Sequence, residues 1–204
     1  MTVYDVTILR MRPGTTAAAL AGVERWLGEH RQAATLYACW YSELGPVNRI
    51  LLLRGFADVP ALHEHREAVL AQSDPFGVGE HLVGFASDAF GHCPGVPALT
   101  TDAHGPWFEV RDYDLVPGGL GPLLDLWRPA LPARLALAPM LTALYAVSGR
   151  MPRFLHLYPW RSLEERLDVR IAARGAGWPP AGAHRHVAAQ ETTIYQAAAF
   201  SPIR

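Results

Sequence analysis

Apolar and polar residues alternate along residues 108–118, and this segment ends in a Pro-Gly pair. An alternation with a period of two predicts a β-strand, and Pro-Gly predicts the turn that ends it. Because side chains two positions apart lie on the same face of a strand, Glu109, Arg111 and Tyr113 are expected to share one face. Residues 4–14 repeat the pattern but carry an aspartate, a threonine and a leucine at these three positions.

Similar patterns in the first half predict the order strand, helix, strand, strand, helix, strand. The predicted strands cover residues 3–11, 36–42, 49–56 and 83–90, and the predicted helices begin near residue 15 and after residue 58. Asp58 is a suitable N-cap residue for the second helix. The second half follows the same order, but its first helix contains Pro129, Pro132 and Pro139, which predicts a bent or shortened helix.

The two halves are related by a constant offset of 104 residues. Identical or similar residues recur at that spacing in the pairs Pro13/Pro117, Gly45/Gly149, Arg49/Arg153, Phe56/Trp160, Arg66/Arg170 and Pro75/Pro179. An ungapped offset of this length indicates internal duplication with two units rather than a solenoid. The proline- and glycine-rich residues 93–106 suit a boundary, so we predict one unit over 1–94 and another over 105–204.

The βαββαβ order predicts an α+β fold made of two tandem ferredoxin-like repeats. In each repeat the helices cover one face of an antiparallel sheet. The third strands, residues 50–53 and 154–157, are apolar on both faces, so the face without helices must also be buried. Packing the two sheets against each other would bury it, and the expected result is a pseudo-twofold dimeric α+β barrel within one chain.

The third strand of the second repeat has two distinct faces. Leu155 and Leu157 lie on one face and His156 and Tyr158 on the other. We expect the leucine face to pack under the helices. His156 and Tyr158 would then face the barrel interior, together with Glu109, Arg111 and Tyr113, and line a pocket in the second half.

Composition excludes several classes of function. The net charge of −1 and the lack of a basic run argue against nucleic-acid binding, and no apolar run is long enough to span a membrane. The chain begins directly with a predicted strand, without a signal peptide, which favours the cytoplasm. Cys39 and Cys93 are expected to be free thiols. All 18 basic residues are arginine, so a lysine Schiff base and a P-loop lysine are excluded.

The predicted pocket could support proton transfer and stabilise an anion. His156 is a candidate general acid or base, and Glu109 could orient it or act itself if burial raises its pKa. Arg111 and Tyr113 could hold an enolate, phenolate or carboxylate. A purely structural Glu109–Arg111 ion pair is the alternative. The candidate substrate-binding residues are Tyr158, Tyr145, Trp40, Tyr41, Arg54 and Asn48.

No metal site is predicted. His63 and His65 lie two positions apart on a predicted helix and therefore point in different directions. His184 and His186 follow a Pro-Pro pair in a loop that could flank a pocket mouth, but no acidic or cysteine ligand accompanies them at suitable spacing.

Two stretches resemble the NIPSNAP family. Residues 109–118 are similar to the family string E-L-R-T-Y-x-L-x-P-G. A second family string, E-I-G-x-L-N-x-V-x-H-L-W-x-Y-x-S-L-x-E-R, is divided between the halves: residues 43–45 and Asn48 match its start, and residues 156–166 its end. The resemblance implies a dimeric α+β-barrel fold but no single reaction. Similar barrels include cofactor-free oxygenases, isomerases, polyketide cyclases, haem enzymes and proteins without known activity.

We therefore expect a cytoplasmic small-molecule enzyme without a bound organic cofactor, an isomerase, a cyclase or lyase, or a cofactor-free oxygenase. Its substrate would be an aromatic, apolar or enolisable metabolite of a biosynthetic pathway. The alternative is a non-catalytic ligand-binding or assembly protein of the NIPSNAP type, and a third is a haem protein. A homo-oligomer is compatible with the enzyme and with the non-catalytic protein of the NIPSNAP type.

Overall fold

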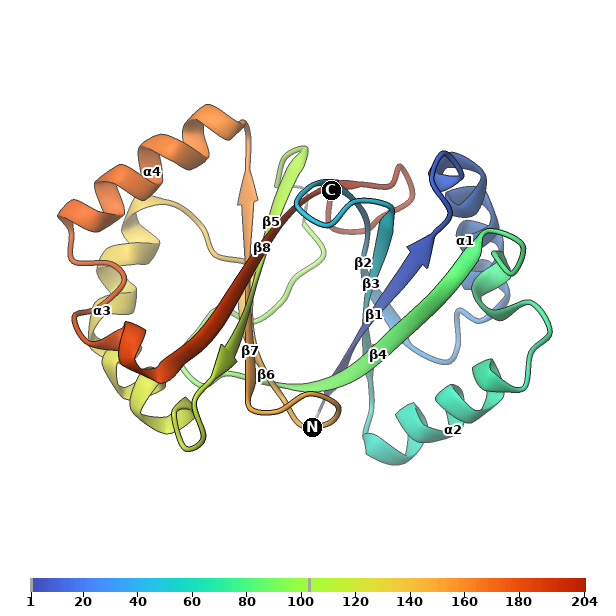
Figure 1. The fold of residues 1–204 in the computed structure, drawn as a ribbon, viewed down its shortest axis with the longest axis horizontal. Coiled ribbons are helices and arrows are strands. Elements are labelled where there is room, and N and C mark those ends of the chain that lie inside the picture. Colours follow the sequence, from blue (N-terminus) through green and yellow to red (C-terminus); the bar gives the residue numbers. More distant parts are fainter. Residues whose placement is uncertain (1, 103) are drawn as a thin grey trace.

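The computed structural model describes residues 2–102 and 104–204 and contains the βαββαβ order twice (Figure 1). The first repeat consists of β1 (Val3–Met11), α1 (Thr16–Glu29), β2 (Thr35–Leu44), β3 (Arg49–Phe56), α2 (Val59–Leu70), the 3-10 helix η1 (Pro75–Gly77) and β4 (Leu82–His92). The second consists of β5 (Trp107–Leu115), α3 (Leu120–Leu137), β6 (Thr142–Ala146), β7 (Arg153–Trp160), α4 (Leu163–Gly175), the 3-10 helix η2 (Ala183–His186) and β8 (Val187–Ala197). The predicted element order is confirmed.

The eight strands close into one barrel in the order β1-β3-β2-β8-β5-β7-β6-β4. Within each repeat the order is that of a ferredoxin-like sheet. The repeats are joined by two antiparallel pairings, β2 with β8 and β4 with β6. The predicted α+β barrel is therefore confirmed. The division into units 1–94 and 105–204 stays a prediction.

The barrel interior is filled by apolar side chains from both repeats. Trp40 and Phe108 stack across it with ring centroids 4.3 Å apart, and Leu155 and Leu157 belong to the same buried cluster. The expectation that this leucine face packs under the helices is wrong. Two sheets that face each other directly exclude water from the space between them. The face that lies inside must therefore consist of apolar side chains that pack closely, as the leucine face does.

The opposite face of the second sheet lies under α3 and α4. Phe154, Tyr158 and Trp160 belong to a cluster that includes Leu123 and Trp127 of α3. Since side chains alternate along a strand, His156, Glu109, Arg111 and Tyr113 also lie on this helix side. Their predicted orientation into the barrel interior is corrected accordingly.

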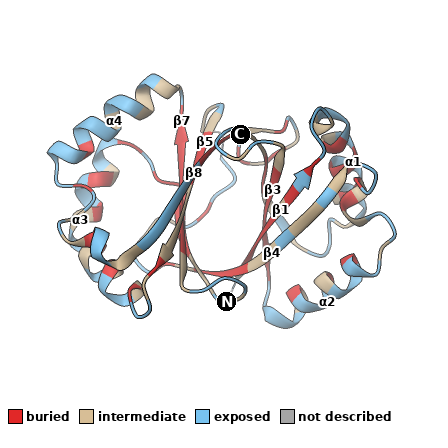
Figure 2. Cartoon of the chain, viewed as in Figure 1, coloured by how far each residue is buried: buried red, intermediate tan, exposed pale blue. Residues whose placement is uncertain are grey.

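Helix α3 is not shortened by its prolines. It has 18 residues, whereas α1 has 14, and Pro129 and Pro132 lie inside it. Both prolines are exposed, so the carbonyl groups that they leave without an intrahelical partner can be hydrated. Figure 2 shows the exposed outer face of α3 and its buried face toward the sheet. The packing of Leu123 and Trp127 outweighs the propensity cost of the prolines.

No helix in the described ranges is long and apolar enough to cross a membrane. Cys39 and Cys93 are free and buried. Burial raises the pKa of both thiols, to about 12 for Cys93. Both therefore remain protonated at neutral pH and lack the thiolate character of a reactive cysteine.

Candidate functional site

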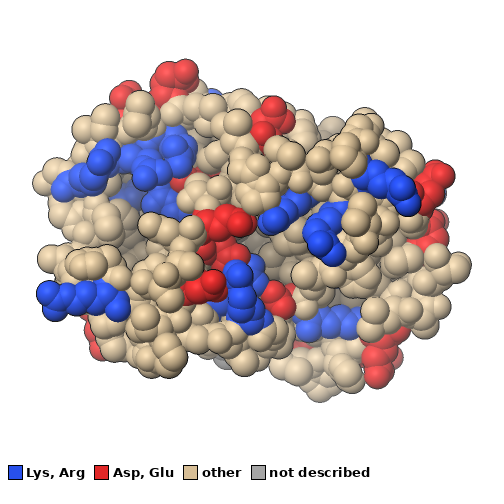
Figure 3. All heavy atoms as spheres, in the orientation of Figure 1, with Lys and Arg blue, Asp and Glu red and all other residues tan. Residues whose placement is uncertain are grey.

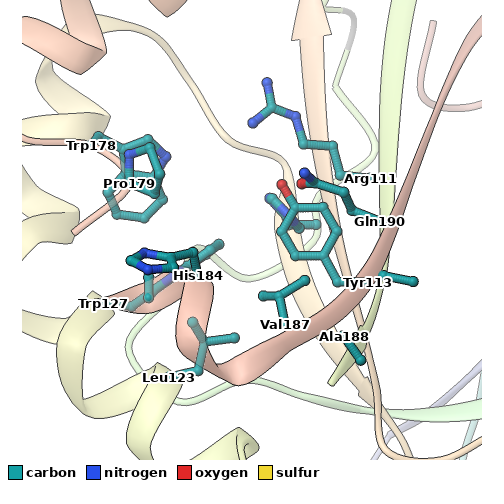
Figure 4. A pocket seen from close by; sticks show the side chains of 13 residues that line it. Arg111, Tyr113, Leu123, Trp127, Trp178, Pro179, His184, Val187, Ala188 and Gln190 are labelled. Carbon is teal, nitrogen blue, oxygen red and sulfur yellow. The ribbon is translucent and has the colours of Figure 1, made fainter. Parts of the chain in front are cut away.

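A cavity of about 280 Å³ lies between the second sheet and the elements that cover it (Figure 4). It is lined by Arg111, Tyr113, Leu123, Trp127, His156, Trp178, Pro179, Ala183, His184, Val187, Ala188, Ala189 and Gln190. Three aromatic rings and several aliphatic groups make most of this surface apolar. The polar groups come from β5, β7, η2 and β8. Such a combination suits a small, largely apolar ligand with a few polar atoms.

The polar residues of the cavity are brought together by strand pairing. Arg111 of β5 is the register partner of His156 on β7, and Glu109 is the partner of Tyr158. Directly opposed side chains in an antiparallel pair lie within contact distance. The alternation of the strands thus places these four side chains on one small area of the helix side.

His156 is almost completely buried, with only 1% of its surface exposed. Its Nδ1 lies 3.0 Å from the hydroxyl oxygen of Tyr158, and its Nε2 has no hydrogen-bond partner in the described part of the chain. Arg111 and Arg134 lie over the Tyr158 ring at 5.0 and 4.8 Å. Among the described residues Nδ1 is the hydrogen-bond partner of the Tyr158 hydroxyl, so the hydroxyl proton is satisfied by donating to Nδ1, and we assign the bond in that direction. The imidazole proton then lies on Nε2.

His156 is neutral at physiological pH. Burial, followed by the charges of Arg111 and Arg134, holds its pKa well below the ordinary value of 6.5. Charging the ring would desolvate a cation beside two other cations. This result changes the role expected from the sequence: His156 can donate a hydrogen bond from Nε2, but it is poorly suited to take up a proton as a general base.

This protonation state can be measured directly. We expect ¹⁵N NMR of the labelled protein to show His156 as the neutral Nε2–H tautomer throughout pH 6.5–8, because burial and the nearby arginines hold its pKa well below 6.5. In Tyr158→Phe the donor to Nδ1 is lost, and the tautomer preference should weaken. An imidazolium signal from His156 near neutral pH would contradict the assignment.

Glu109 is fully buried and binds several donors. Its Oε1 accepts from Arg111 Nε at 3.0 Å and from Arg166 Nη2 at 2.7 Å, and its Oε2 accepts from Trp160 Nε1 at 3.0 Å. Burial by itself would raise the pKa of Glu109, but hydrogen bonds from Arg166 and the charge of Arg111 outweigh it and lower the pKa. The raised pKa considered for Glu109 is therefore wrong. Glu109 remains ionised and positions Arg111.

Tyr158 and Tyr145 do not line the cavity. Tyr158 is fully buried beneath it and touches the site through its hydroxyl group on His156. Burial raises the pKa of Tyr158 to about 12 despite the nearby charges of Arg111 and Arg134, so the hydroxyl stays protonated. Tyr145 packs at the edge of the apolar cluster under α3.

Four further candidates belong to other parts of the barrel. Trp40 lies in the interior and donates from Nε1 to the carbonyl oxygen of Ile203 at 3.0 Å. Tyr41 donates to Gln196 at 2.6 Å, and Arg54 binds Asp5 on the helix side of the first repeat at 2.8 Å. Asn48 lies in the turn after β2 with a φ of 57°. These residues do not line the cavity on the helix side of the second sheet, so their predicted role in substrate binding is not supported by their positions.

Several lining residues were not identified as site residues from the sequence. Trp178, Pro179 and residues 187–190 enter the cavity because the segment after α4 folds back over the sheet. The sequence predicts His184 in a loop that could flank a pocket mouth, and the structure places it in the lining (Figure 4). The Trp-Pro-Pro string followed by a histidine cluster was the available signal, but it carries no information on which sheet face it covers.

The first repeat lacks the polar groups of this site. The positions equivalent to Arg111, Tyr113 and His156 hold Thr7, Leu9 and Leu52. The buried carboxylate and one of its arginines are retained: Asp5 takes the place of Glu109 and binds Arg54 and Arg66 at 2.8 Å each, and Arg66 corresponds to Arg170. The first repeat also pairs Arg54 with His65 at 2.7 Å, but it has no histidine at the position of His156.

The cavity fits haem poorly. Its volume of about 280 Å³ is at the lower end of the range for ligand pockets, and a haem is larger than most small-molecule ligands. Nε2 of His156, the atom that would bind iron, carries the proton in the assigned tautomer. The rings of Tyr113 and Trp127 lie edge to face against His156 at 4.6 and 5.1 Å. Among the described residues no cluster of three metal-ligating side chains occurs.

Comparison with known proteins relates the chain to one family and several barrels. The NIPSNAP family model matches residues 4–76 and 108–202. An anthrone oxidase-like protein is similar in structure, with a TM-score of 0.65 and 13% identity over 97% of this chain and 91% of that one. No match was found among curated proteins.

Two further solved structures share the fold. A putative monooxygenase from Fusobacterium nucleatum subsp. nucleatum has a TM-score of 0.68 and 10% identity, covering 96% of this chain and 92% of its own. A mutant chlorite dismutase from Candidatus Nitrospira defluvii in complex with cyanide has a TM-score of 0.62 and 12% identity, covering 96% and 90%. At these identities the similarity establishes the barrel fold alone.

Proposed function

The chain belongs to the NIPSNAP family, and on that premise we propose that its second repeat is a small-molecule enzyme that works without a bound organic cofactor. The observation that carries the proposal is the buried His156, whose Nε2 has no hydrogen-bond partner among residues 2–102 and 104–204 and which lies beside Arg111 in a cavity lined by aromatic rings. An unpaired buried donor is unfavourable unless something else uses it. A carbonyl or phenol oxygen of a substrate would satisfy it.

The proposed substrate is an aromatic compound that can form an enolate or phenolate. Its rings would lie among Trp127, Trp178 and Tyr113, and its oxygen would accept hydrogen bonds from His156 Nε2 and from Arg111. Negative charge develops on that oxygen when a substrate carbon transfers its proton to His184, the other imidazole of the lining, and the electron pair of the C–H bond moves toward the oxygen. Donors that the fold already orients toward that oxygen stabilise such charge in the transition state.

Isomerisation, cyclisation and cofactor-free oxygenation can all begin from this anion. Because one solved barrel of the same fold is described as anthrone oxidase-like, an anthrone is a reasonable probe for the third reaction. Oxidation of anthrone to anthraquinone consumes one O₂ per molecule. One oxygen atom becomes the new carbonyl, and the other leaves as water with the two hydrogens of the oxidised carbon.

The proposal can be tested through the shared first step. We expect the purified protein to accelerate exchange of the α-hydrogens of 2-tetralone in D₂O, followed by ¹H NMR, because enolate formation is common to the three reactions. Anthrone with an oxygen electrode tests the oxygenase branch. If the protein accelerates neither reaction over buffer, it is a non-catalytic binding or assembly protein of the NIPSNAP type. An intense Soret band in the purified protein would instead support haem binding.

A cytoplasmic location and an aromatic or apolar small molecule as the partner are part of the same proposal. A homo-oligomer is compatible with it, because the site is built from one chain.

A further inference from the structure

A second cavity of about 100 Å³ adjoins the first. It is lined by Arg111, Arg134, Val169, Arg170, Ala173, Arg174, Trp178 and Pro179. Three of these residues, Arg111, Trp178 and Pro179, also line the larger cavity. The two spaces therefore meet at the guanidinium group of Arg111, which Figure 4 shows above the ring of Tyr113.

The smaller cavity is cationic. Four of its eight lining residues are arginines, and none is acidic. In Figure 3 the basic atoms form a group over α4 at the upper left, beside a hollow in the surface. By contrast, the larger cavity contains one arginine among thirteen residues. The two spaces thus differ in the chemistry of their walls.

The arginines outnumber the carboxylates that could neutralise them. Glu109 is the acidic residue at this cluster, and it is shared by Arg111, Arg166 and, at 3.8 Å, Arg170. Arg134 is 4% exposed, and its Nη1 donates to the carbonyl oxygen of Ala138 at 2.8 Å rather than to a carboxylate. Several buried or half-buried positive charges around a single negative one repel each other, and a further anion would relieve this repulsion.

We propose that the smaller cavity binds a carboxylate group of the substrate, so that the substrate class is an aromatic carboxylic acid with its ring in the larger cavity. This inference rests on the proposed function, since it assigns a second group to the same ligand. The arginine fork suits a carboxylate because its parallel N–H groups match the two carboxylate oxygens. The small volume suits a group of a few atoms.

The test compares an acid with its neutral analogue of the same shape. 2-Naphthoic acid and 2-naphthamide are titrated separately into the full-length protein by isothermal calorimetry. We expect the acid to bind at least roughly tenfold more tightly, because its charge is stabilised by several arginines. Added salt should weaken binding of the acid more than binding of the amide, since salt screens charge interactions.

Variants then locate the carboxylate. Arg170 and Arg174 are both exposed, so the double substitution Arg170→Gln with Arg174→Gln should fold normally. It should remove most of the preference for the acid and leave binding of the amide within about twofold. Arg128→Gln is the matched control, because Arg128 is on the exposed surface of α3 and pairs with Asp125 outside both cavities. That control should keep the full preference.

The outcomes separate the two proposals. Equal affinities for the acid and the amide would overturn the carboxylate site, while exchange of 2-tetralone would still support the enzyme. An acid preference that is undiminished in the double variant would also overturn it, because the carboxylate would then bind elsewhere. If neither compound binds and no exchange is seen, the carboxylate site and the proposed function fall together.

Discussion

Replacing His156 with leucine is expected to lower kcat for the enolisation reaction by roughly 10²–10³-fold, the usual effect of removing one donor from a developing oxyanion. Nε2 of His156 has no partner in the described chain, so the substrate oxygen is its proposed acceptor. A donor that acts mainly on the charged transition state affects kcat more than KM. The measurement is the steady-state exchange rate of 2-tetralone at several concentrations.

The leucine substitution is well matched to the fold. The equivalent position in the first repeat is Leu52, which is fully buried in the same place on its strand. The substitution removes the acceptor of the buried Tyr158 hydroxyl, so we expect it to cost about 1–3 kcal/mol of stability. Urea unfolding of the variant serves as the control, and a variant that is fully folded under the assay conditions assigns the rate loss to the missing donor.

The pH profile distinguishes a neutral donor from a general base. Because the pKa of His156 is held well below 6.5, the wild-type rate between pH 6.5 and 8 should show no acid limb from this residue. The profile of His156→Leu should have the same shape at a lower level. Loss of an acid limb in the variant would show that His156 exchanges a proton, contrary to the assignment. Retention of the full wild-type rate would move the site elsewhere.

Replacing Glu109 with glutamine is expected to destabilise the protein by about 3–5 kcal/mol, as for other buried ion pairs that lose one partner. The carboxylate accepts from Arg111, Arg166 and Trp160 and is fully buried. An amide has one oxygen instead of two and no charge, so Arg111 and Arg166 would be left near each other without compensation. The measurement is the free energy of unfolding in urea.

The same carboxylate predicts part of the acid sensitivity. Its folded pKa is lowered, so its contribution to stability is complete above the unfolded pKa of about 4.3 and is lost as the pH falls through the folded value. Wild-type stability should therefore decrease below about pH 4, and the decrease should be smaller in Glu109→Gln. Asp5, whose pKa is also lowered, accounts for an acid response that remains in the variant.

Asp125→Asn provides the matched control for the loss of a carboxylate. Asp125 and its partner Arg128 are both exposed on α3, and exposed pairs of this kind contribute little. We expect no measurable change in the unfolding free energy. A similarly small effect of Glu109→Gln would mean that the buried cluster tolerates the loss of its only shared carboxylate, against the structural interpretation.

The sequence was sufficient for the architecture because the fold depends on repeated local patterns. The offset of 104 residues relates Pro13 to Pro117 and Arg66 to Arg170, and the strand periodicity correctly grouped Glu109, Arg111 and Tyr113 on one face. The double βαββαβ order then left a barrel as the natural way to bury both sheet faces. A period of two groups residues, but it does not say which group faces inward.

The tertiary structure decided that question and, with it, the chemistry of the site. Leu155 and Leu157 fill the interior because two facing sheets require close apolar packing, and His156 consequently lies under α3. Its neutral state depends on complete burial and on two arginines, of which Arg134 is brought near by α3 and is distant in sequence from Arg111. Periodicity is a property of neighbouring residues, whereas burial and charge depend on segments that meet only after folding. The duplicated barrel and the residues that share a face thus follow from the sequence, whereas the side on which that face lies and the charge of its groups follow from the fold.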